Sequence, residues 1–192
     1  MTVWAAGNNR HIVGEGRVSS YCMNTTRQST NAAALDRNLR PQFYSSLGGQ
    51  CWPLNPTVCA PTFGILPWGK GFQDMGEQGG ATSSCAPMVA ASLAIMMTRW
   101  PRRPFGDYRA ALRASANNAV LGRPGVEFDH ATGAGLLQAH LAVDAVPRAH
   151  SHFSWALEQA LETSVSPLGA EPERIQLEKL LRRPAVRYAS LG

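Results

Sequence analysis

The stretch that decides the fold is Gly79-Gly80-Ala81-Thr82-Ser83-Ser84-Cys85-Ala86-Pro87-Met88-Val89-Ala90. Two glycines open it, and an apolar run that continues to Met97 closes it. This pattern predicts a Gly-rich turn that delivers a serine to the N-terminus of a helix. The helical run from Ala86 to Met97 is apolar nearly all round, so we expect it to be buried on all sides. We place Pro87 in the first turn, where its missing N–H leaves no hydrogen bond unmade.

A serine at the start of a helix can have a chemical use. The first N–H groups of a helix have no intrahelical partner and the helix dipole is positive there, so negative charge that develops at Ser83 is stabilised. The same pattern also fits an ordinary Ser/Thr helix cap, which carries no chemistry. The stretch alone leaves both interpretations open.

Residues Ala81 to Ala90 are similar, at the same spacing, to the nucleophile motif of the subtilisin-like serine proteases, Gly-Thr-Ser-x-Ala-x-Pro-x-Val-Ala. The distance to the proline selects Ser83, not Ser84, as the nucleophile. Ala81 stands where glycine is usual, and a methyl group is disfavoured there if the backbone needs a positive φ. Cys85 stands where a small alanine is usual, and we expect it to be an inert thiol in the core.

A second motif of the family lies at the start of the chain. Val3-Trp4-Ala5-Ala6-Gly7-Asn8 is similar to Val-x-Ala-Ala-Gly-Asn, in which a strand ends on the asparagine whose amide binds the oxyanion. The resemblance therefore implies that Asn8 lies in the oxyanion hole and faces the same small cavity as Ser83. An amide suits this role because it donates a hydrogen bond without bringing a charge next to the nucleophile.

A third motif lies near residue 135. Thr132-Gly133-Ala134-Gly135-Leu136-Leu137-Gln138-Ala139 is similar to the closing Gly-x-Gly-x-x-x-Ala turn of the family, whose role is structural. Weaker similarities lie between the motifs, including Ala60-Pro61-Thr62, which resembles an Ala-Pro-Gly turn. The resemblance covers residues 2–147. Trp4 and Leu136-Leu137 are also similar to the kexin and furin branch of the family.

The catalytic Asp and His of the family are not at their expected places. A subtilisin triad runs Asp, His, Ser along the chain, and the first two precede the oxyanion asparagine. Only seven residues precede Asn8, so neither family position falls within this sequence. The histidines follow Asn8 and none matches the base: His11, His130, His140, His150 and His152. A surrogate base at His130, next to Asp129, is not expected, since adjacent Asp-His pairs are common in loops. Without a base a subtilisin loses about a millionfold in rate.

The remaining sequence predicts an α/β protein. Three short apolar segments are expected as buried strands: Thr2–Ala6, Ala32–Leu35 and Thr57–Ala60. Two further helices are expected, one capped by Asp107 and running to Ala116, the other at Leu136–Val146. Together with the resemblance, these elements indicate the C-terminal half of a three-layer subtilisin-like fold, a parallel sheet with helices on both faces.

The domain division follows from a change of character after Pro147. Residues 1–147 are expected to form the C-terminal half of a subtilisin-like peptidase domain. Residues 148–192 are expected to be an appended helical tail with amphipathic helices at Ser154–Val165 and Pro172–Arg182.

Composition argues against several classes of function. The net charge is +5, but the 18 basic residues are scattered and no basic stripe interleaved with aromatics occurs, so we expect no nucleic-acid partner. The longest apolar run is shorter than the roughly 20 residues that cross a bilayer, so we expect no membrane partner. Four cysteines without Cys-x-x-Cys spacing argue against a zinc site. If the protein is exported, one disulfide can form among Cys22, Cys51 and Cys59.

The resemblance implies a serine endopeptidase that acts on a peptide or protein substrate. Ser83 and Asn8 are its candidate catalytic residues, and a missing N-terminal half would supply Asp and His, so the isolated chain is expected to be inactive. The alternative is a non-catalytic subtilisin-like homologue that binds peptides or proteins. No cofactor is identified; calcium is often bound in the family, but no complete set of oxygen ligands can be placed. The family is largely exported, yet this chain carries no signal peptide, so its compartment stays open.

Overall fold

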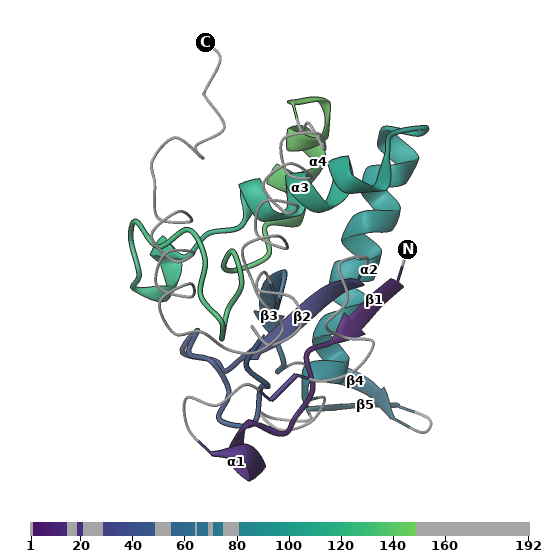
Figure 1. Ribbon diagram of the computed structural model, residues 1–192. Coiled ribbons are helices and arrows are strands. Elements are labelled where there is room, and N and C mark those ends of the chain that lie inside the picture. Colours follow the sequence, from purple (N-terminus) through teal and green to yellow (C-terminus); the bar gives the residue numbers. More distant parts are fainter. Residues whose placement is uncertain are drawn as a thin grey trace.

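The computed structural model describes residues 2–14, 19–20, 29–48, 55–63, 65–68, 71–74 and 81–148. Its strands are β1 (Thr2–Ala5), β2 (Ser29–Leu35), β3 (Val58–Pro61), β4 (Ile65–Trp68) and β5 (Gly71–Asp74). Its helices are α1 (Arg10–Val13), α2 (Ala81–Arg99), α3 (Phe105–Ser115) and α4 (Ala139–Ala145), with short 3-10 helices at Ala119–Leu121 and Val146–Arg148 (Figure 1). Both helices predicted for the tail lie outside the described residues, so the tail stays a prediction.

The central sheet is parallel and has the order β1-β2-β3. Thr2 pairs with Ser29 in the first ladder and Ala32 pairs with Val58 in the second, so the three predicted strands are confirmed. Because the strands are parallel, their carboxyl ends lie at one edge of the sheet. The residues that follow β1 and β3 there include Asn8 and Thr62, at the edge where parallel α/β sheets usually carry their ligands.

Side chains alternate between the two faces of the sheet, as a strand requires. Small residues of β2 and β3, such as Ala32 and Ala60, face α2, α3 and α4 in the main core cluster. Ala33 and Cys59 face the opposite side, where Leu121 and Leu136 close a smaller cluster. The small side chains let α2 pack closely on the sheet, which fixes where this helix begins. The predicted α/β class with a parallel sheet is confirmed.

The helix α2 is not buried on all sides, and this expectation was wrong. It buries one face on all three strands of the parallel sheet: Thr82, Cys85, Val89, Ser92, Leu93 and Met96. Its other face is apolar and exposed, with Ile95 at 55% and Met97 at 47% exposure. By length and composition α2 also meets the requirements for a membrane span, but core helices meet them too, so one such helix is weak evidence. The described sheet therefore leaves half of its main helix uncovered.

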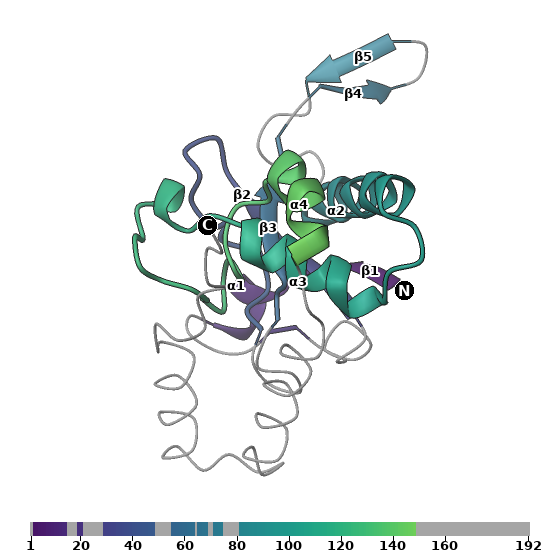
Figure 2. The same ribbon diagram turned by 90° about the horizontal axis from the view of Figure 1, so that it is seen from above.

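Several boundaries differ from those predicted. The helix α3 begins after Pro104, so Asp107 lies in its first turn and is not the cap. The last helix begins at Ala139, not at Leu136, because the residues before it extend the sheet: Leu137 N–H donates to the Cys59 carbonyl (2.9 Å). The antiparallel hairpin β4–β5 was not predicted, and it projects away from the sheet and helices (Figure 2).

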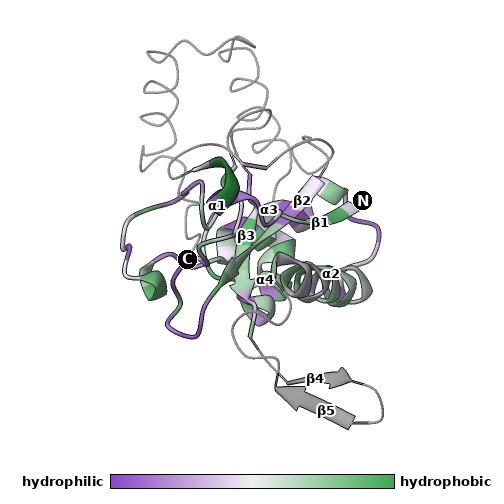
Figure 3. Cartoon of the chain, turned by 90° about the horizontal axis from the view of Figure 1, so that it is seen from below, coloured by the Kyte–Doolittle hydropathy of each residue, from purple (hydrophilic) through white to green (hydrophobic). Residues whose placement is uncertain are grey.

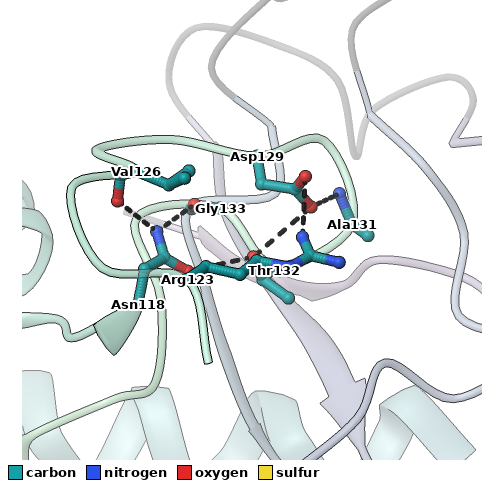
Figure 4. A network of polar contacts seen from close by, with 7 residues as sticks. All are labelled: Asn118, Arg123, Val126, Asp129, Ala131, Thr132 and Gly133. Atoms are coloured by element: carbon teal, nitrogen blue, oxygen red, sulfur yellow. Dashed lines mark hydrogen bonds and ion pairs between the residues drawn. The ribbon is translucent and has the colours of Figure 1, made fainter. Parts of the chain in front are cut away.

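A polar network closes the loop between α3 and α4 (Figure 4). The Asp129 carboxylate accepts from the Ala131 N–H (2.8 Å) and pairs with Arg123 (2.8 Å). Asn118 donates to the Val126 carbonyl (3.0 Å) and accepts from the Thr132 hydroxyl (3.2 Å). These contacts order the loop itself, and the Ala134 N–H, which donates to the Thr57 carbonyl (3.0 Å), joins the predicted closing turn to the amino end of β3.

We expect Gly133→Ala to disrupt this loop. Gly133 has a φ of +64°, and a Cβ there would meet the backbone of Pro56 and Thr57. The substitution should lower the free energy of unfolding by about 2–4 kcal/mol, from backbone strain and overpacking together. Gly122, with a φ of +73° and open space around its Cβ, is the matched control: Gly122→Ala should cost about 1 kcal/mol, from strain alone. Equal losses in urea denaturation would contradict the close packing of Gly133.

Candidate active site

Ser83 is the third residue of α2 and its side chain is exposed. The expectation that Pro87 lies in the first turn was wrong, because the helix begins at Ala81 and Pro87 lies inside it. A proline inside a helix leaves the carbonyl four residues earlier without its N–H partner and crowds it. That carbonyl belongs to Ser83. The carbonyl that lacks a helical N–H partner thus belongs to the residue that the motif assigns to catalysis.

The Asn8 side chain lies against the residue that precedes Ser83. Its Oδ1 accepts from the Thr82 N–H (3.1 Å) and from the Thr82 hydroxyl (2.8 Å). The Thr82 hydroxyl in turn accepts from the Gly7 N–H (3.3 Å). Because the oxygen of the amide is engaged twice, its Nδ2 is the end left to donate, and it makes no hydrogen bond to any described residue. The end of β1 and the start of α2 are thus joined at one point.

A second set of hydroxyl groups holds the other side of the turn. The Thr62 hydroxyl donates to the Ala81 carbonyl (2.6 Å), and the Ser84 hydroxyl donates to the same carbonyl (3.0 Å). Tyr44 donates to the Thr62 hydroxyl (3.4 Å). Ser84 is therefore committed to structural contacts, whereas Ser83 forms no side-chain hydrogen bond within the described part of the chain. This difference favours Ser83 over Ser84 as the reactive group.

Ala81 has a φ of +47°, in the left-handed region that favours glycine. The methyl group of Ala81 is thus strained at the position where the nucleophile motif carries glycine. For an L-residue other than glycine this conformation costs about 1–2 kcal/mol. Such strain persists only where surrounding contacts over-determine it, and it is typical of functional sites.

The electrostatics at this point favour a developing negative charge. The first turn of α2 contains no acidic residue that would neutralise the positive end of the helix dipole. Burial raises the pKa of the Cys85 thiol to about 12, so this neighbour is neutral at physiological pH. Cys85 is fully buried with its Sγ 3.2 Å from the Ala60 carbonyl, which confirms the expectation of an inert core thiol. The Cys85 side chain therefore brings no negative charge to the start of α2.

Three histidines lie in the described region: His11, His130 and His140. His130 belongs to the loop that packs through Gly133 on Thr57, at the amino end of β3. Ser83 lies near Thr62, beyond the carboxyl end of β3, so the length of this strand separates it from His130. His11 lies in α1 with its ring against Phe43 (centroids 5.6 Å apart). His140 lies in α4, and none of these three rings hydrogen-bonds Ser83, so the described residues offer no support for a surrogate base.

The cysteines and acidic residues give no metal centre in the described ranges. No group of three His, Cys, Asp or Glu side chains is close enough to hold an ion there. Cys59 and Cys85 are free and buried, so Cys59 forms no disulfide. Cys22 and Cys51 lie outside the described residues.

Two site residues were not assigned a role from the sequence. Thr82 was visible only as part of the nucleophile motif, and its contact with Asn8 depends on strand β1 meeting α2. Thr62 was noted only in the Ala-Pro-Gly-like turn, where it replaces the glycine. The available signal was that two motif glycines are replaced in this chain, one by Thr62 and the other by Ala81.

A parallel α/β sheet that carries a serine at a helix N-terminus beside an asparagine amide has the architecture of a serine hydrolase of the subtilisin type. The family model of the subtilases, peptidase S8, matches residues 1–135. The chain belongs to the subtilase family, which is a family of serine proteases.

The structure is similar to that of fervidolysin from Fervidobacterium pennivorans, a keratinolytic enzyme related to subtilisin. The TM-score is 0.54 and the sequences are 24% identical, so this likeness shows the fold. The match covers 74% of this chain and 22% of that one, so the chain spans about a fifth of that enzyme's length. No curated protein matches the sequence.

We expect Thr82→Val to destabilise the chain and Ser83→Ala to leave its stability unchanged. Thr82 is fully buried, and its hydroxyl serves both Asn8 and Gly7, so its loss should cost about 1–3 kcal/mol. Ser83 is exposed, so its hydroxyl should contribute less than about 0.5 kcal/mol. Urea denaturation of the two variants measures the difference. A destabilising Ser83→Ala would mean that this hydroxyl has a structural role.

Proposed function

We propose that this chain carries the nucleophile and the oxyanion hole of a serine endopeptidase. The observation that supports the proposal most strongly is the contact of Asn8 with Thr82 at the start of α2. It sets an amide donor beside a helix N-terminus whose next residue, Ser83, is exposed and makes no structural hydrogen bond to the described residues.

In this mechanism the Ser83 Oγ attacks the carbonyl carbon of the scissile peptide bond. A histidine from outside this chain accepts the hydroxyl proton and later passes it to the leaving amine. The oxygen of the tetrahedral intermediate accepts hydrogen bonds from Asn8 Nδ2 and from the Ser83 N–H. Fixed donors of this kind are worth about 3–4 kcal/mol each in the transition state. Water then hydrolyses the acyl-enzyme.

The partner that we propose is an N-terminal half that supplies the Asp and His of the triad. The exposed face of α2, with Met88, Ile95 and Met97, supports it, because an apolar helix face of this length usually packs against protein. A smaller apolar surface lies on part of α1, close to Asn8 in the sequence: this part is green in Figure 3, and Ile12 is 72% exposed. Both surfaces adjoin elements that form the site.

The second candidate is a non-catalytic subtilisin-like homologue that binds peptides or partner proteins. The strained Ala81 favours it, since a chain released from catalysis need not keep the glycine of the motif. Under this alternative Asn8 and Ser83 are residues retained from a catalytic ancestor, and they lie at the edge of the sheet where a peptide binds.

Three finer assignments stay with the proposal. The first is the division into a peptidase portion, residues 1–147, and a helical tail, residues 148–192. The second is a place near the kexin and furin branch; residues 19–31 contain no carboxylate that would select a basic substrate. The third is calcium binding, for which the described residues offer no cluster of three ligands.

We predict that the isolated chain of 192 residues hydrolyses neither casein nor a peptide ester above background. The decisive comparison is the same chain extended by whatever coding sequence lies in frame upstream of Met1. If that sequence carries Asp-Gly and His-Gly-Thr type motifs, the extended protein should cleave casein, and a fluorophosphonate should label Ser83. In it, Asn8→Ala should lower kcat by about 100- to 1,000-fold.

Two outcomes would count against the proposal. Cleavage by the isolated chain that disappears in Ser83→Ala would require a base within these residues. An extended protein with both motifs that binds peptides but neither cleaves them nor reacts at Ser83 would establish the non-catalytic alternative.

A further inference from the structure

We propose that the Thr62 hydroxyl is a positioning group that holds Ala81 in its left-handed conformation and so fixes the turn that presents Ser83. The inference rests on the proposed function for its catalytic meaning, but the geometry it describes can be tested without activity. It concerns two positions at which this chain departs from the glycines of the family motifs, Ala81 and Thr62. The side chain of Thr62 is in direct contact with the backbone of Ala81.

The contact between them is short and buried. The Thr62 side chain lies where β3 ends, is 3% exposed, and donates to the Ala81 carbonyl at 2.6 Å. Ala81, with its φ of +47°, is one of the few described residues other than glycine in the left-handed region. A conformation of this kind needs external contacts to persist. A buried hydroxyl bonded to the carbonyl of the strained residue is such a contact.

The hydroxyl of Thr62 is itself oriented. A hydroxyl has one proton, and the Tyr44 hydroxyl donates its own proton to the Thr62 oxygen (3.4 Å). Burial raises the pKa of Tyr44, which keeps this phenol protonated and able to donate. The Thr62 proton then has two acceptors in reach, the Ala81 carbonyl at 2.6 Å and the Ser84 Oγ at 3.1 Å, and the shorter contact is the one to Ala81. Tyr44 and Thr62 thus form a chain of two donors that ends on the Ala81 carbonyl, the acceptor at the strained residue.

The effect of this chain on Ser83 follows from its neighbours. Ala81 is held by Thr62, Thr82 is held by Asn8, and the Ser84 hydroxyl returns to the Ala81 carbonyl. Ser83 lies between these clamped residues, and its exposed hydroxyl makes no structural bond to the described part of the chain. Releasing Ala81 would therefore allow the first turn of α2 to rotate and would move Ser83 relative to the amide of Asn8.

The test is a double-mutant cycle in the full chain, with Thr62→Val and Ala81→Gly. Thr62→Val keeps the shape of the side chain and removes its hydroxyl, and we expect it to lower Tm by about 4–8 °C. In the Ala81→Gly background, where the left-handed conformation needs no clamp, it should lower Tm by less than half as much. Thr62→Ser keeps the hydroxyl and should restore most of the loss.

A spectroscopic signal separates positioning from general stability. In NMR spectra, the amide-to-α-proton coupling and the Cβ shift of Ala81 report its φ, and both should change in Thr62→Val and persist in Thr62→Ser. Thr132→Val is the matched control, because it removes another buried threonine hydroxyl, bonded to Asn118, at a remote site. Its cost should be the same in the unsubstituted chain and in the Ala81→Gly background, and it should leave the Ala81 signals unchanged.

The proposal would be overturned if Thr62→Val cost the same Tm in both backgrounds while Ala81 kept its signals. Unfolding of Thr62→Val even when combined with Ala81→Gly would overturn it too, because a glycine needs no clamp. Folding of Thr62→Val only in the Ala81→Gly background would support it. Catalysis enters separately: in the extended protein Thr62→Val should lower kcat at least about tenfold with KM little changed. Absence of any activity in that protein would count against the proposed function and leave the NMR result standing.

Discussion

The site depends on one pair of hydrogen bonds, from the N–H and hydroxyl of Thr82 to the Asn8 side chain, across 74 residues of sequence. They join the carboxyl end of an outer strand of the described sheet to the start of its main helix. Without them the amide of Asn8 has no fixed direction and the first turn of α2 loses a partner for an N–H that the helix cannot satisfy. The packing of α2 on the sheet and the geometry of the candidate site therefore both depend on the contact between Asn8 and Thr82.

Much of the fold could be predicted because local sequence patterns determine it. Short apolar runs indicated the three strands, and the Gly133 and Gly135 turn indicated the closing segment, where both residues do have positive φ. The start of α2 differs from the prediction because Pro87 lies inside the helix, which begins at Ala81, although a proline there removes one helical hydrogen bond. The β4–β5 hairpin was missed because its residues lack a clear alternation.

The candidate site was predictable only in part. Asn8 and Ser83 came from motifs, but the contacts that hold them come from Thr82, Thr62 and Tyr44, and these depend on how the sheet and helix meet. The exposure of one face of α2 could not be predicted from the sequence pattern either, because an apolar run does not show which of its faces packs against the rest of the chain. The strain at Ala81 was the exception: the sequence showed an alanine where glycine is usual, and the structure shows the positive φ that explains the preference.

The most direct test of the account is the distance between Asn8 Nδ2 and Ser83 Oγ in a crystal structure of the chain. The two groups must reach the oxygen and the carbon of one carbonyl, so the account predicts about 6 Å or less, with both side chains at the carboxyl edge of the sheet. A separation of more than about 12 Å, or placement on opposite faces of the sheet, would contradict it. Family membership would then describe the ancestry of the chain but not a working nucleophile and oxyanion hole.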